Sequence, residues 1–509
     1  MQLRQLINEL PAVTVEGSLD REVAGITYDS RRVAPGMIFV AIRGQHVDGH
    51  DFINSAIDRG AAAVICERNG FVSQRVTKIK VTDVREALAL AAAAYYQHPS
   101  TKLKVIGVTG TNGKTTVAFM VKHLLETAGV KTGLLGTIRY EVGERVFPAQ
   151  RTTPEALEVQ QMLSHMVRAE CEACVMEVSS HALDQKRVAG VEFDIALFTN
   201  LTQDHLDYHG TMEQYFEAKS RLFSPQFLGT KRGGSVINID DEFGHRLQSE
   251  SKAQVQLTYG LQEAAMLRAS EIRLGTDGTR MTVETPDFHF PCHLPLIGRH
   301  NVYNALAAVG AGMVLKLGAV PLRTALNTME PVPGRLENVA AGFPFGVYVD
   351  YAHTEDALRN VLATLRELTT GRILLAFGCG GSRDQGKRAK MGRVAAELAD
   401  FTLVTTDNPR KEAPEKIAGQ IEAGLCSVRH ARYRVELDRK RAIHAIISMA
   451  GAGDVVLIAG KGHETYQEFE DTVVPFDDRI YARETLEALP PSLGGGQERR
   501  PESGETEGE

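Results

Sequence analysis

A short glycine-rich segment carries residue types suited to holding phosphate. Its residues are Gly110, Thr111, Asn112, Gly113, Lys114, Thr115 and Thr116, and they follow the apolar run Val105–Thr109. Glycines let backbone amides approach phosphate oxygens, and the N-terminus of a following helix adds a favourable partial charge. Lys114 can then reach the terminal phosphates and Thr115 can ligate magnesium. Although Val108 stands where the general pattern has its first glycine, the segment predicts a nucleotide site.

Two further polar segments follow apolar runs in the middle of the chain. Glu177 lies near the end of the run Ala173–Val178, and His205 follows the run Ile195–Thr199. A carboxylate and an imidazole at strand ends can hold magnesium against the γ-phosphate. Either segment alone is more often a capping cluster. Because the phosphate loop accompanies them, we interpret them as the rest of the nucleotide site.

Polar segments also follow four strand-like runs in the last third of the chain, after Tyr351, Phe377, Thr405 and Ala459. Strands are expected at Ile373–Phe377 and Val455–Ala459, among others, and helical segments such as Glu355–Leu368 separate the runs, which is the alternation of a Rossmann-like sheet. In such sheets ligands bind beyond the carboxyl ends of the strands. We therefore expect these four segments to share one crevice.

The elements that position these residues indicate an α/β protein, because strand-like and helical segments alternate. A chain of 509 residues exceeds one hydrophobic core. We expect three domains: a small mixed α/β domain at 1–100, a central P-loop domain with a mostly parallel sheet at 101–336, and a Rossmann-like domain at 337–489. Residues 490–509 are rich in proline, glycine and glutamate, which predicts a disordered acidic tail.

Composition narrows the kinds of partner. The formal net charge is -7, of which residues 497–509 contribute three negative charges, so no broad basic surface is available for nucleic acid. Six cysteines lack the spacing of a disulfide scaffold, which is typical of a reducing cytosol. No apolar run reaches the length of a membrane span. We expect a cytoplasmic monomer that binds small anionic molecules.

The motifs together resemble the Mur ligase family, whose nucleotide loop reads Gly-Thr-Asn-Gly-Lys-Thr-Thr, over nearly everything before the tail. Supporting matches lie at Gly298–Ala305, Gly334–Glu337 and Asp350–His353. The resemblance implies ATP contacts from Asn301, Arg335, Asp350 and His353, in addition to the phosphate loop. It also implies that magnesium binds Glu177 and His205, besides Thr115, and that Lys219 is carbamylated. Lys114, Lys219, His205 and Glu177 would then be the catalytic residues.

The resemblance further implies a site for a UDP-linked muramoyl dipeptide. Its residues would be Tyr28, Ser30, Gln45, His46, Val47, Thr152, Thr153, Ser179, Gln185 and Arg187. Thr152 to Glu155 is also a plain helix N-cap signal, and both interpretations can hold together. Arg151 stands where some family members have asparagine.

A third set would choose the amino acid that is added. It comprises Arg383, Asp407, Asn408, Pro409, Arg410, Gly460 and Glu464. Meso-diaminopimelate carries a second carboxylate and ammonium, so its pocket needs a cation such as arginine together with acidic or carbonyl acceptors. A lysine-adding relative has no far carboxylate to pair. By resemblance, this set favours meso-diaminopimelate.

The expected activity is ATP-dependent amide ligation. The γ-carboxylate of UDP-N-acetylmuramoyl-L-alanyl-D-glutamate would become an acyl phosphate, and meso-diaminopimelate would displace the phosphate to form a tripeptide for peptidoglycan synthesis. Three alternatives stay open at this point: a lysine-adding family member, a folylpolyglutamate-type ligase, and a nucleotide switch that forms no covalent product.

Overall fold

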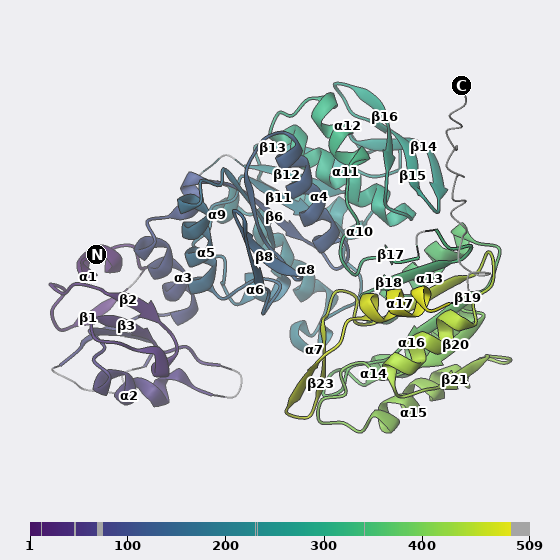
Figure 1. The fold of residues 1–509 in the computed structure, drawn as a ribbon. Helices are drawn as coiled ribbons and strands as arrows, with labels where there is room; N and C mark the ends of the chain where they lie inside the picture. Colours follow the sequence, from purple (N-terminus) through teal and green to yellow (C-terminus); the bar gives the residue numbers. More distant parts are fainter. Residues whose placement is uncertain are drawn as a thin grey trace, which may run out of the picture. The chain divides into compact units, whose positions relative to one another are not determined.

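The computed structural model describes residues 1–11, 13–44, 47–68, 75–229, 231, 233–340 and 342–489 (Figure 1). The chain packs into two compact units. The first comprises Met1–Arg273, Thr279–Pro295 and Arg299–Met329, and the second holds the chain from Glu330 onward with two short segments, Leu274–Gly278 and Leu296–Gly298. The tail predicted at 490–509 lies outside the described residues. None of the described helices is both long and apolar enough to cross a membrane.

The first unit begins with a five-stranded sheet. Its strands, in order across the sheet, are β1 (Thr14–Glu16), β5 (Thr77–Lys80), β4 (Ala63–Cys66), β3 (Met37–Val40) and β2 (Gly25–Thr27). All neighbours are parallel except β1 and β5. The alanine-rich helix α3 (Val84–Tyr95) packs its small side chains into the core of this sheet. Small residues allow such close packing.

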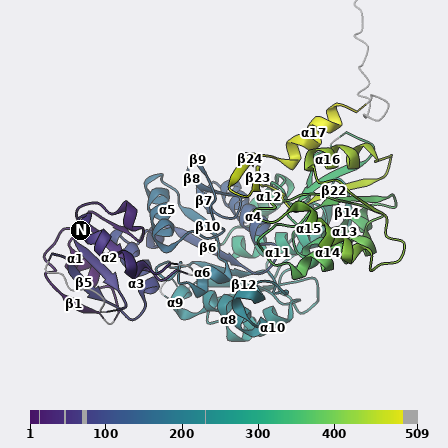
Figure 2. The same cartoon turned by 90° about the horizontal axis from the view of Figure 1, so that it is seen from below.

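An eight-stranded sheet forms the centre of the first unit. Its order is β13 (Val255–Tyr259), β12 (Gly234–Asn238), β11 (Ile195–Phe198), β6 (Lys104–Thr109), β10 (Ala173–Glu177), β7 (Thr132–Leu135), β8 (Arg139–Val142) and β9 (Arg145–Pro148). In Figure 2, β6, β10, β7, β8 and β9 follow one another across the view. The six strands from β13 to β7 are parallel, whereas β8 and β9 are antiparallel.

The register of this sheet brings its functional loops to one edge. Glu177 at the end of β10 pairs with Val108 in β6, and Phe198 at the end of β11 pairs with Thr109. Strands β10, β11 and β12 are buried along their whole length, as expected for parallel strands covered on both faces. The phosphate loop and the segments after Glu177 and Phe198 therefore leave the sheet side by side.

A three-stranded sheet follows, in which β15 and β16 are antiparallel, and the sequence prediction did not include it. Its strands are β14 (Arg268–Gly275), β15 (Gly278–Glu284) and β16 (His289–Leu294). Many of the β14 side chains are partly or fully exposed, so its sequence lacks the continuous apolar character of the strands that were predicted.

The second unit holds a six-stranded sheet of the predicted Rossmann-like kind. Its order is β17 (Glu337–Asn338), β18 (Gly346–Asp350), β22 (Val455–Ala459), β19 (Ile373–Phe377), β20 (Phe401–Val404) and β21 (Tyr433–Val435). Only β17 is antiparallel to its neighbour. Five helices accompany the sheet: α13 (Glu355–Leu368), α14 (Gly386–Leu398), α15 (Pro414–Leu425), α16 (Arg439–Ser448) and α17 (Asp478–Glu487).

The carboxyl ends of four of these strands lie in one row. Asp350 pairs with Ala459, Ala459 with Phe377, and Phe377 with Val404. The segments that follow the four strands therefore start at the same edge of the sheet, as the sequence predicts. A hairpin of β23 (Tyr466–Phe469) and β24 (Thr472–Pro475) adjoins this edge, because Arg410 and Phe469 form a β-bridge.

Candidate active site

The phosphate loop joins β6 to α4 (Lys114–Thr127). Gly110 and Gly113 have positive φ angles of 145° and 84°, conformations that side-chain-bearing residues rarely adopt. A Cβ atom on Gly113 would lie 2.6 Å from the side-chain oxygen of Asn304. Lys114 Nζ donates to the carbonyl oxygens of Gly110, at 2.9 Å, and Thr111, at 2.8 Å. The loop thus has the strand, turn and helix that phosphate binding requires.

Glu177 is fully buried and adjoins the loop. Its Oε2 accepts hydrogen bonds from the hydroxyls of Thr115 and Thr137, each at 3.0 Å, and its Oε1 accepts from the backbone amide of Thr137 at 2.8 Å. A carboxylate beside a threonine hydroxyl at the start of this helix is a suitable donor pair for magnesium. Sequence reasoning gave Thr137 no role, and the only available signal was Gly136-Thr137 directly after the end of β7.

Lys219 is fully buried on α8 (Met212–Ser220), although lysine is normally exposed. Its Nζ donates to the carbonyl oxygen of Gly110 at 2.7 Å and lies 4.6 Å from the centre of the Tyr215 ring. Burial, followed by the charge of Lys114, holds the pKa of Lys219 well below that of a free lysine. Burial therefore shifts the equilibrium of Lys219 toward the neutral amine, compared with an exposed lysine.

His205 lies directly before the short helix α7 (Leu206–His209), in a left-handed conformation with φ of 54°. Its ring meets the ring of His181 edge-on, with centroids 4.9 Å apart. Within the described part of the chain, no three His, Cys, Asp or Glu side chains gather closely enough to hold a metal ion. A magnesium site here would need the hydroxyl of Thr115 and an oxygen ligand on Lys219 to complete it.

The residues predicted to cradle the muramoyl dipeptide form one hydrogen-bonded group in the first unit. Thr153 Oγ1 donates to the Glu177 carbonyl at 2.8 Å and accepts from the Ser179 amide at 3.1 Å. The buried Arg187 guanidinium donates to the Thr153 carbonyl at 3.1 Å and to Gln185 Oε1 at 2.7 Å. Hydrogen bonds therefore hold four of the predicted residues together next to the end of β10. They are Thr153, Ser179, Gln185 and Arg187.

Thr152 connects this group to the phosphate loop. Its Oγ1 lies 3.1 Å from the hydroxyl of Thr137, which in turn donates to Glu177, and Glu177 accepts from Thr115. A continuous path of short polar contacts thus runs from the phosphate loop to the predicted dipeptide site. The two sets of residues adjoin one another.

The predicted residues of the N-terminal sheet are placed only in part. Tyr28 donates from its hydroxyl to Glu158 Oε1 at 2.9 Å, and Glu158 lies on α5 (Ala156–Arg168), the helix that follows Thr152 and Thr153. Ser30 begins a 3-10 turn, and Val47 is exposed. Gln45 and His46 lie outside the described residues.

The second unit places Arg335 and His353 against the ring of Tyr351, which directly follows Asp350 in the chain. The Arg335 guanidinium lies 4.8 Å from the ring centre and the His353 ring 4.6 Å from it. The buried Asp350 carboxylate accepts from the backbone amides of Leu336 and Ala352, each at 2.7 Å. Asn301, assigned to the same ligand, belongs to the first unit, where its Oδ1 accepts from Asn304 Nδ2 at 2.9 Å.

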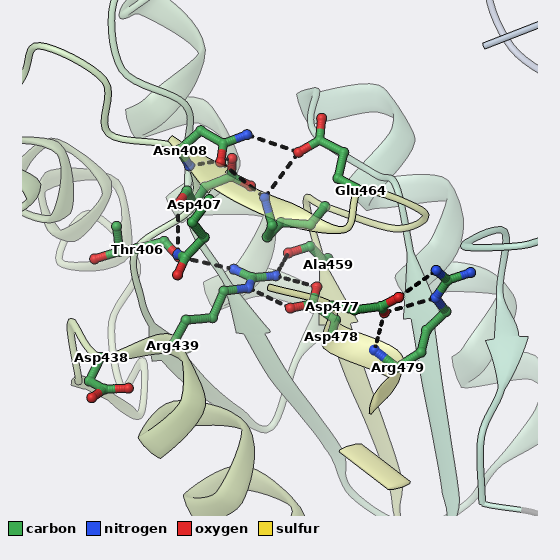
Figure 3. Close-up of polar contacts among 12 residues, drawn as sticks. Thr406, Asp407, Asn408, Asp438, Arg439, Ala459, Glu464, Asp477, Asp478 and Arg479 are labelled. Atoms are coloured by element: carbon green, nitrogen blue, oxygen red, sulfur yellow. Dashed lines mark hydrogen bonds and ion pairs between the residues drawn. The ribbon is translucent and has the colours of Figure 1, made fainter. Parts of the chain in front are cut away.

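The residues predicted to select the amino acid gather at the edge of the second sheet. Asn408 Nδ2 donates to Glu464 Oε2 at 2.8 Å, and the fully buried Lys461 donates to both Asn408 Oδ1 and Glu464 Oε2 at 3.0 Å (Figure 3). Both contacts fall on Oε2, and the other carboxylate oxygen of Glu464 points away from them in Figure 3. Burial raises the pKa of Glu464, while the Lys461 ammonium opposes that shift.

Close backbone approach joins the loops of this cluster. A Cβ on Gly460, where φ is 113°, would lie 2.6 Å from Asp407 Oδ2, and a Cβ on Gly381 would clash with the Pro409 carbonyl. Arg410 donates to Glu468 Oε2 at 2.8 Å and to the Gly381 carbonyl at 3.0 Å. Of the seven predicted residues, all of which the structure describes, only Arg383 is exposed, in the loop after β19. The cluster therefore combines fixed polar groups with two arginines at its margin.

Comparison with known protein families finds three matches along the chain. Residues 22–96 match the Mur ligase family catalytic domain, residues 108–312 the Mur ligase middle domain, and residues 334–462 the Mur ligase glutamate ligase domain. The chain belongs to the Mur ligase family. The predicted α/β class with three domains is confirmed, whereas the predicted domain boundaries stay predictions.

Relatives of this Mur ligase are similar over almost their whole length. The chain is 44% identical over 486 residues to the UDP-N-acetylmuramoyl-L-alanyl-D-glutamate--2,6-diaminopimelate ligase of Syntrophomonas wolfei. The aligned region covers 96% of this chain and 99% of the relative. The protein of the same name from Geobacter metallireducens is 44% identical over 496 residues, covering 94% and 97%. A solved structure of a ligase of this name matches with 32% identity and a TM-score of 0.70, covering 96% and 99%.

Proposed function

We propose that this Mur ligase adds meso-2,6-diaminopimelate to UDP-N-acetylmuramoyl-L-alanyl-D-glutamate, at the expense of ATP. The relatives that carry this name support the substrates. The observation that carries the chemistry is the polar path from Thr115 through Glu177 and Thr137 to Thr152. Phosphoryl transfer needs donor and acceptor held in line at short range. Adjoining phosphate and dipeptide residues meet that need.

The reaction has two steps. An oxygen of the D-glutamyl γ-carboxylate attacks the γ-phosphorus of ATP, the bond from that phosphorus to the bridging oxygen breaks, and ADP leaves. The amine of diaminopimelate then attacks the acyl carbon, a carbon–nitrogen bond forms, phosphate leaves and the amine loses a proton. Lys114 stabilises the negative charge on the transferred phosphoryl group. The product is the UDP-linked muramoyl tripeptide used in peptidoglycan synthesis.

Magnesium would be held by Thr115, Glu177, His205 and a carbamate on Lys219. The neutral amine of Lys219 attacks carbon dioxide, forms a nitrogen–carbon bond and loses a proton, which leaves an anionic carbamate. The buried position of Lys219 and its lowered pKa support this assignment, because only the neutral amine can react. When bound, magnesium neutralises phosphate charge during transfer. The hydroxyl of Thr115 and the carboxylate of Glu177 are already adjacent.

The second unit would bind the amino acid through the cluster around Asn408, Arg410 and Glu464. A zwitterionic far end of the ligand suits an arginine together with a carboxylate oxygen that its neighbours leave available. We also propose a cytoplasmic location and a monomeric state. The six cysteines are free thiols, which suits a reducing compartment.

Phosphate release with each substrate omitted in turn tests this proposal against the switch alternative. Release should require ATP, magnesium, the UDP-linked dipeptide and an amino acid together. A nucleotide switch would instead hydrolyse ATP without the amine, and that outcome would refute ligation. A folylpolyglutamate-type ligase would release phosphate with a folate in place of the UDP-linked dipeptide.

Replacing Thr137 with valine should lower kcat/KM about 10-fold, because a buried carboxylate loses a hydrogen bond worth roughly 1.4 kcal/mol. The valine keeps the shape of the side chain but removes the hydroxyl that donates to Glu177. Steady-state kinetics over a magnesium titration would measure the effect. Thr137→Ser is the matched control and should keep most of the activity. Equal activity in both variants would show that Thr137 does not support the site.

Replacing Arg410 with lysine should raise the KM for diaminopimelate about 10- to 100-fold while leaving the KM for ATP unchanged. Lysine keeps the charge but loses the planar fork that pairs with a carboxylate, a loss of about 1.5–3 kcal/mol. Initial rates with each substrate varied would separate the two constants. Arg429→Lys, at an exposed position, is the control. An unchanged KM for diaminopimelate would remove Arg410 from the amino-acid site.

A further inference from the structure

Arg439 and Asp478 form a fully buried ion pair in the second unit. Arg439 is the first residue of α16 and Asp478 the first residue of α17. The guanidinium donates from Nε to Asp478 Oδ1 and from NH2 to Asp478 Oδ2, each at 2.7 Å (Figure 3). This two-point contact fixes both the position and the rotation of the guanidinium plane.

The remaining donors of Arg439 reach two different loops. One nitrogen donates to the Thr406 carbonyl at 3.3 Å and the other to the Ala459 carbonyl at 3.0 Å. Thr406 directly precedes Asp407 and Asn408, and Ala459 directly precedes Gly460 and the segment that contains Glu464. The strands that lead to these loops are β20 and β22, which are separated in the sheet by β19. Arg439 therefore spans the end of β19 and joins the two loops.

Other buried contacts act on the same two loops. Gln467 Nε2 donates to the Asp407 carbonyl at 2.9 Å, and Lys461 links Asn408 to Glu464 directly. Figure 3 shows Arg439 below Asp407, Asn408 and Glu464 in that view. The distance between Asn408 and Glu464 therefore depends both on the direct link through Lys461 and on the hydrogen bonds that Arg439 and Gln467 donate to the loop backbone.

Stability alone is a weak reason for such a pair. Burying two charges costs several kcal/mol per ion, and replacing a buried ion pair with apolar residues of similar volume is often neutral or stabilising. An apolar pair could fill the same volume and hold α16 against α17. It could not donate to two carbonyls at once, and this is the property that the arginine adds.

We propose that Arg439 is a positioning residue for amino-acid binding, which sets the distance between Asn408 and Glu464 by tying the Thr406 and Ala459 carbonyls. Asp478 orients the guanidinium for this task. Neither residue touches the substrate. The inference rests on the proposed function, because it assumes that the loops 406–410 and 460–464 bind the incoming amino acid.

Two variants test the inference by their effects on KM. The double variant Arg439→Met with Asp478→Leu removes both charges but keeps the volume apolar, and Arg439→Lys keeps a charge that cannot bridge both carbonyls. We expect each to raise the KM for diaminopimelate about 10- to 100-fold, since displacement of a positioning contact by about 1 Å can have an effect of that size. The KM values for ATP and for the UDP-linked dipeptide should stay within about twofold of the wild-type values.

A control pair lies at the amino-terminal ends of two strands of the same sheet, opposite the carboxyl ends from which the binding loops leave. Arg372 donates to Asp454 just before β19 and β22 begin, so Arg372→Met with Asp454→Leu removes an ion pair far from the loops. This control should leave all three KM values unchanged, even if it lowers the melting temperature. A specific rise in the KM for diaminopimelate in both Arg439 variants supports the positioning role. An unchanged KM in Arg439→Lys, or an equal rise in all three KM values, overturns it.

The wild-type enzyme separates this inference from the function on which it rests. If wild-type protein forms no product with diaminopimelate, the proposed function fails, whatever the variants do. If wild-type protein is active but the variants bind diaminopimelate as well as it does, only the positioning role fails. Should the double variant not fold, Arg439→Lys decides the matter alone, because it retains the buried charge and the pairing with Asp478.

Discussion

Replacing Lys219 with methionine is expected to lower kcat on the order of 10³-fold, comparable to the loss of a principal charge-stabilising group in an active site. Methionine fills a similar volume but cannot form a carbamate, so the magnesium ligands would be incomplete. The effect should fall on kcat because charge on the phosphoryl group develops most strongly in the transition state. Steady-state kinetics at saturating substrates would measure it.

Two further observations separate a carbamate from an ordinary buried lysine. Activity of the unaltered enzyme should fall when carbon dioxide is removed and return when bicarbonate is added. The exposed Lys252→Met is the control and should be fully active at every bicarbonate concentration. Full activity of the Lys219 variant, or indifference of the wild-type enzyme to bicarbonate, would contradict the assignment.

Replacing Lys114 with methionine is expected to lower kcat/KM for ATP on the order of 10²- to 10³-fold. The ammonium of Lys114 lies against the carbonyls of Gly110 and Thr111, within the loop that would surround the phosphates. Methionine keeps the length of the side chain and removes the charge that would stabilise phosphoryl transfer. Removal of the Lys114 charge should also raise the pKa of Lys219, because that charge helps to lower it.

A lysine on the same helix provides the control for this prediction. Lys122 pairs with Glu126 and with the buried Glu141, and Lys122→Met should change kcat/KM less than about threefold, since Lys122 lies about two helical turns from the phosphate loop and Glu141 keeps its ion pair with Arg139. Initial rates with ATP varied would give both values. Similar losses in the two variants would mean that Lys114 acts through the stability of α4.

The central parallel strands of the two larger sheets were predictable because they are buried, apolar runs, whereas parallel strands with polar residues, such as β13 and β21, were not predicted. The predicted strands Ile373–Phe377 and Val455–Ala459 and the predicted helix Glu355–Leu368 have the same bounds in the structure. Each buried strand is a short unbroken apolar run, and the helix has a regular apolar face. The sheet β14–β16 was missed because buried and exposed residues alternate along its strands, as they do in strands with one exposed face. Such strands contain no continuous apolar run.

The clustering of candidate site residues at strand ends was also predictable. The rule that ligands bind beyond the carboxyl ends of parallel strands needs only the strands, and the register then brings Glu177 beside the phosphate loop. Thr137 was missed because a threonine after a short strand has no distinctive pattern.

Arg439 and Asp478 were missed for a different physical reason. Charged residues at helix starts are usually solvated, and only the packing of α16 and α17 buries them. No local pattern in the sequence distinguishes a buried pair of this kind from two exposed charges, because the partners are 39 positions apart.

The measurement that tests the central claim most directly is product analysis by mass spectrometry. Purified protein would be incubated with ATP, magnesium and UDP-N-acetylmuramoyl-L-alanyl-D-glutamate, together with meso-diaminopimelate, with lysine, or with no amino acid. We expect a tripeptide product, with ADP and phosphate, only when meso-diaminopimelate is present. A lysine-containing product would contradict the role given to Arg410 and its neighbours, and ATP hydrolysis without any amide product would contradict the ligase assignment itself.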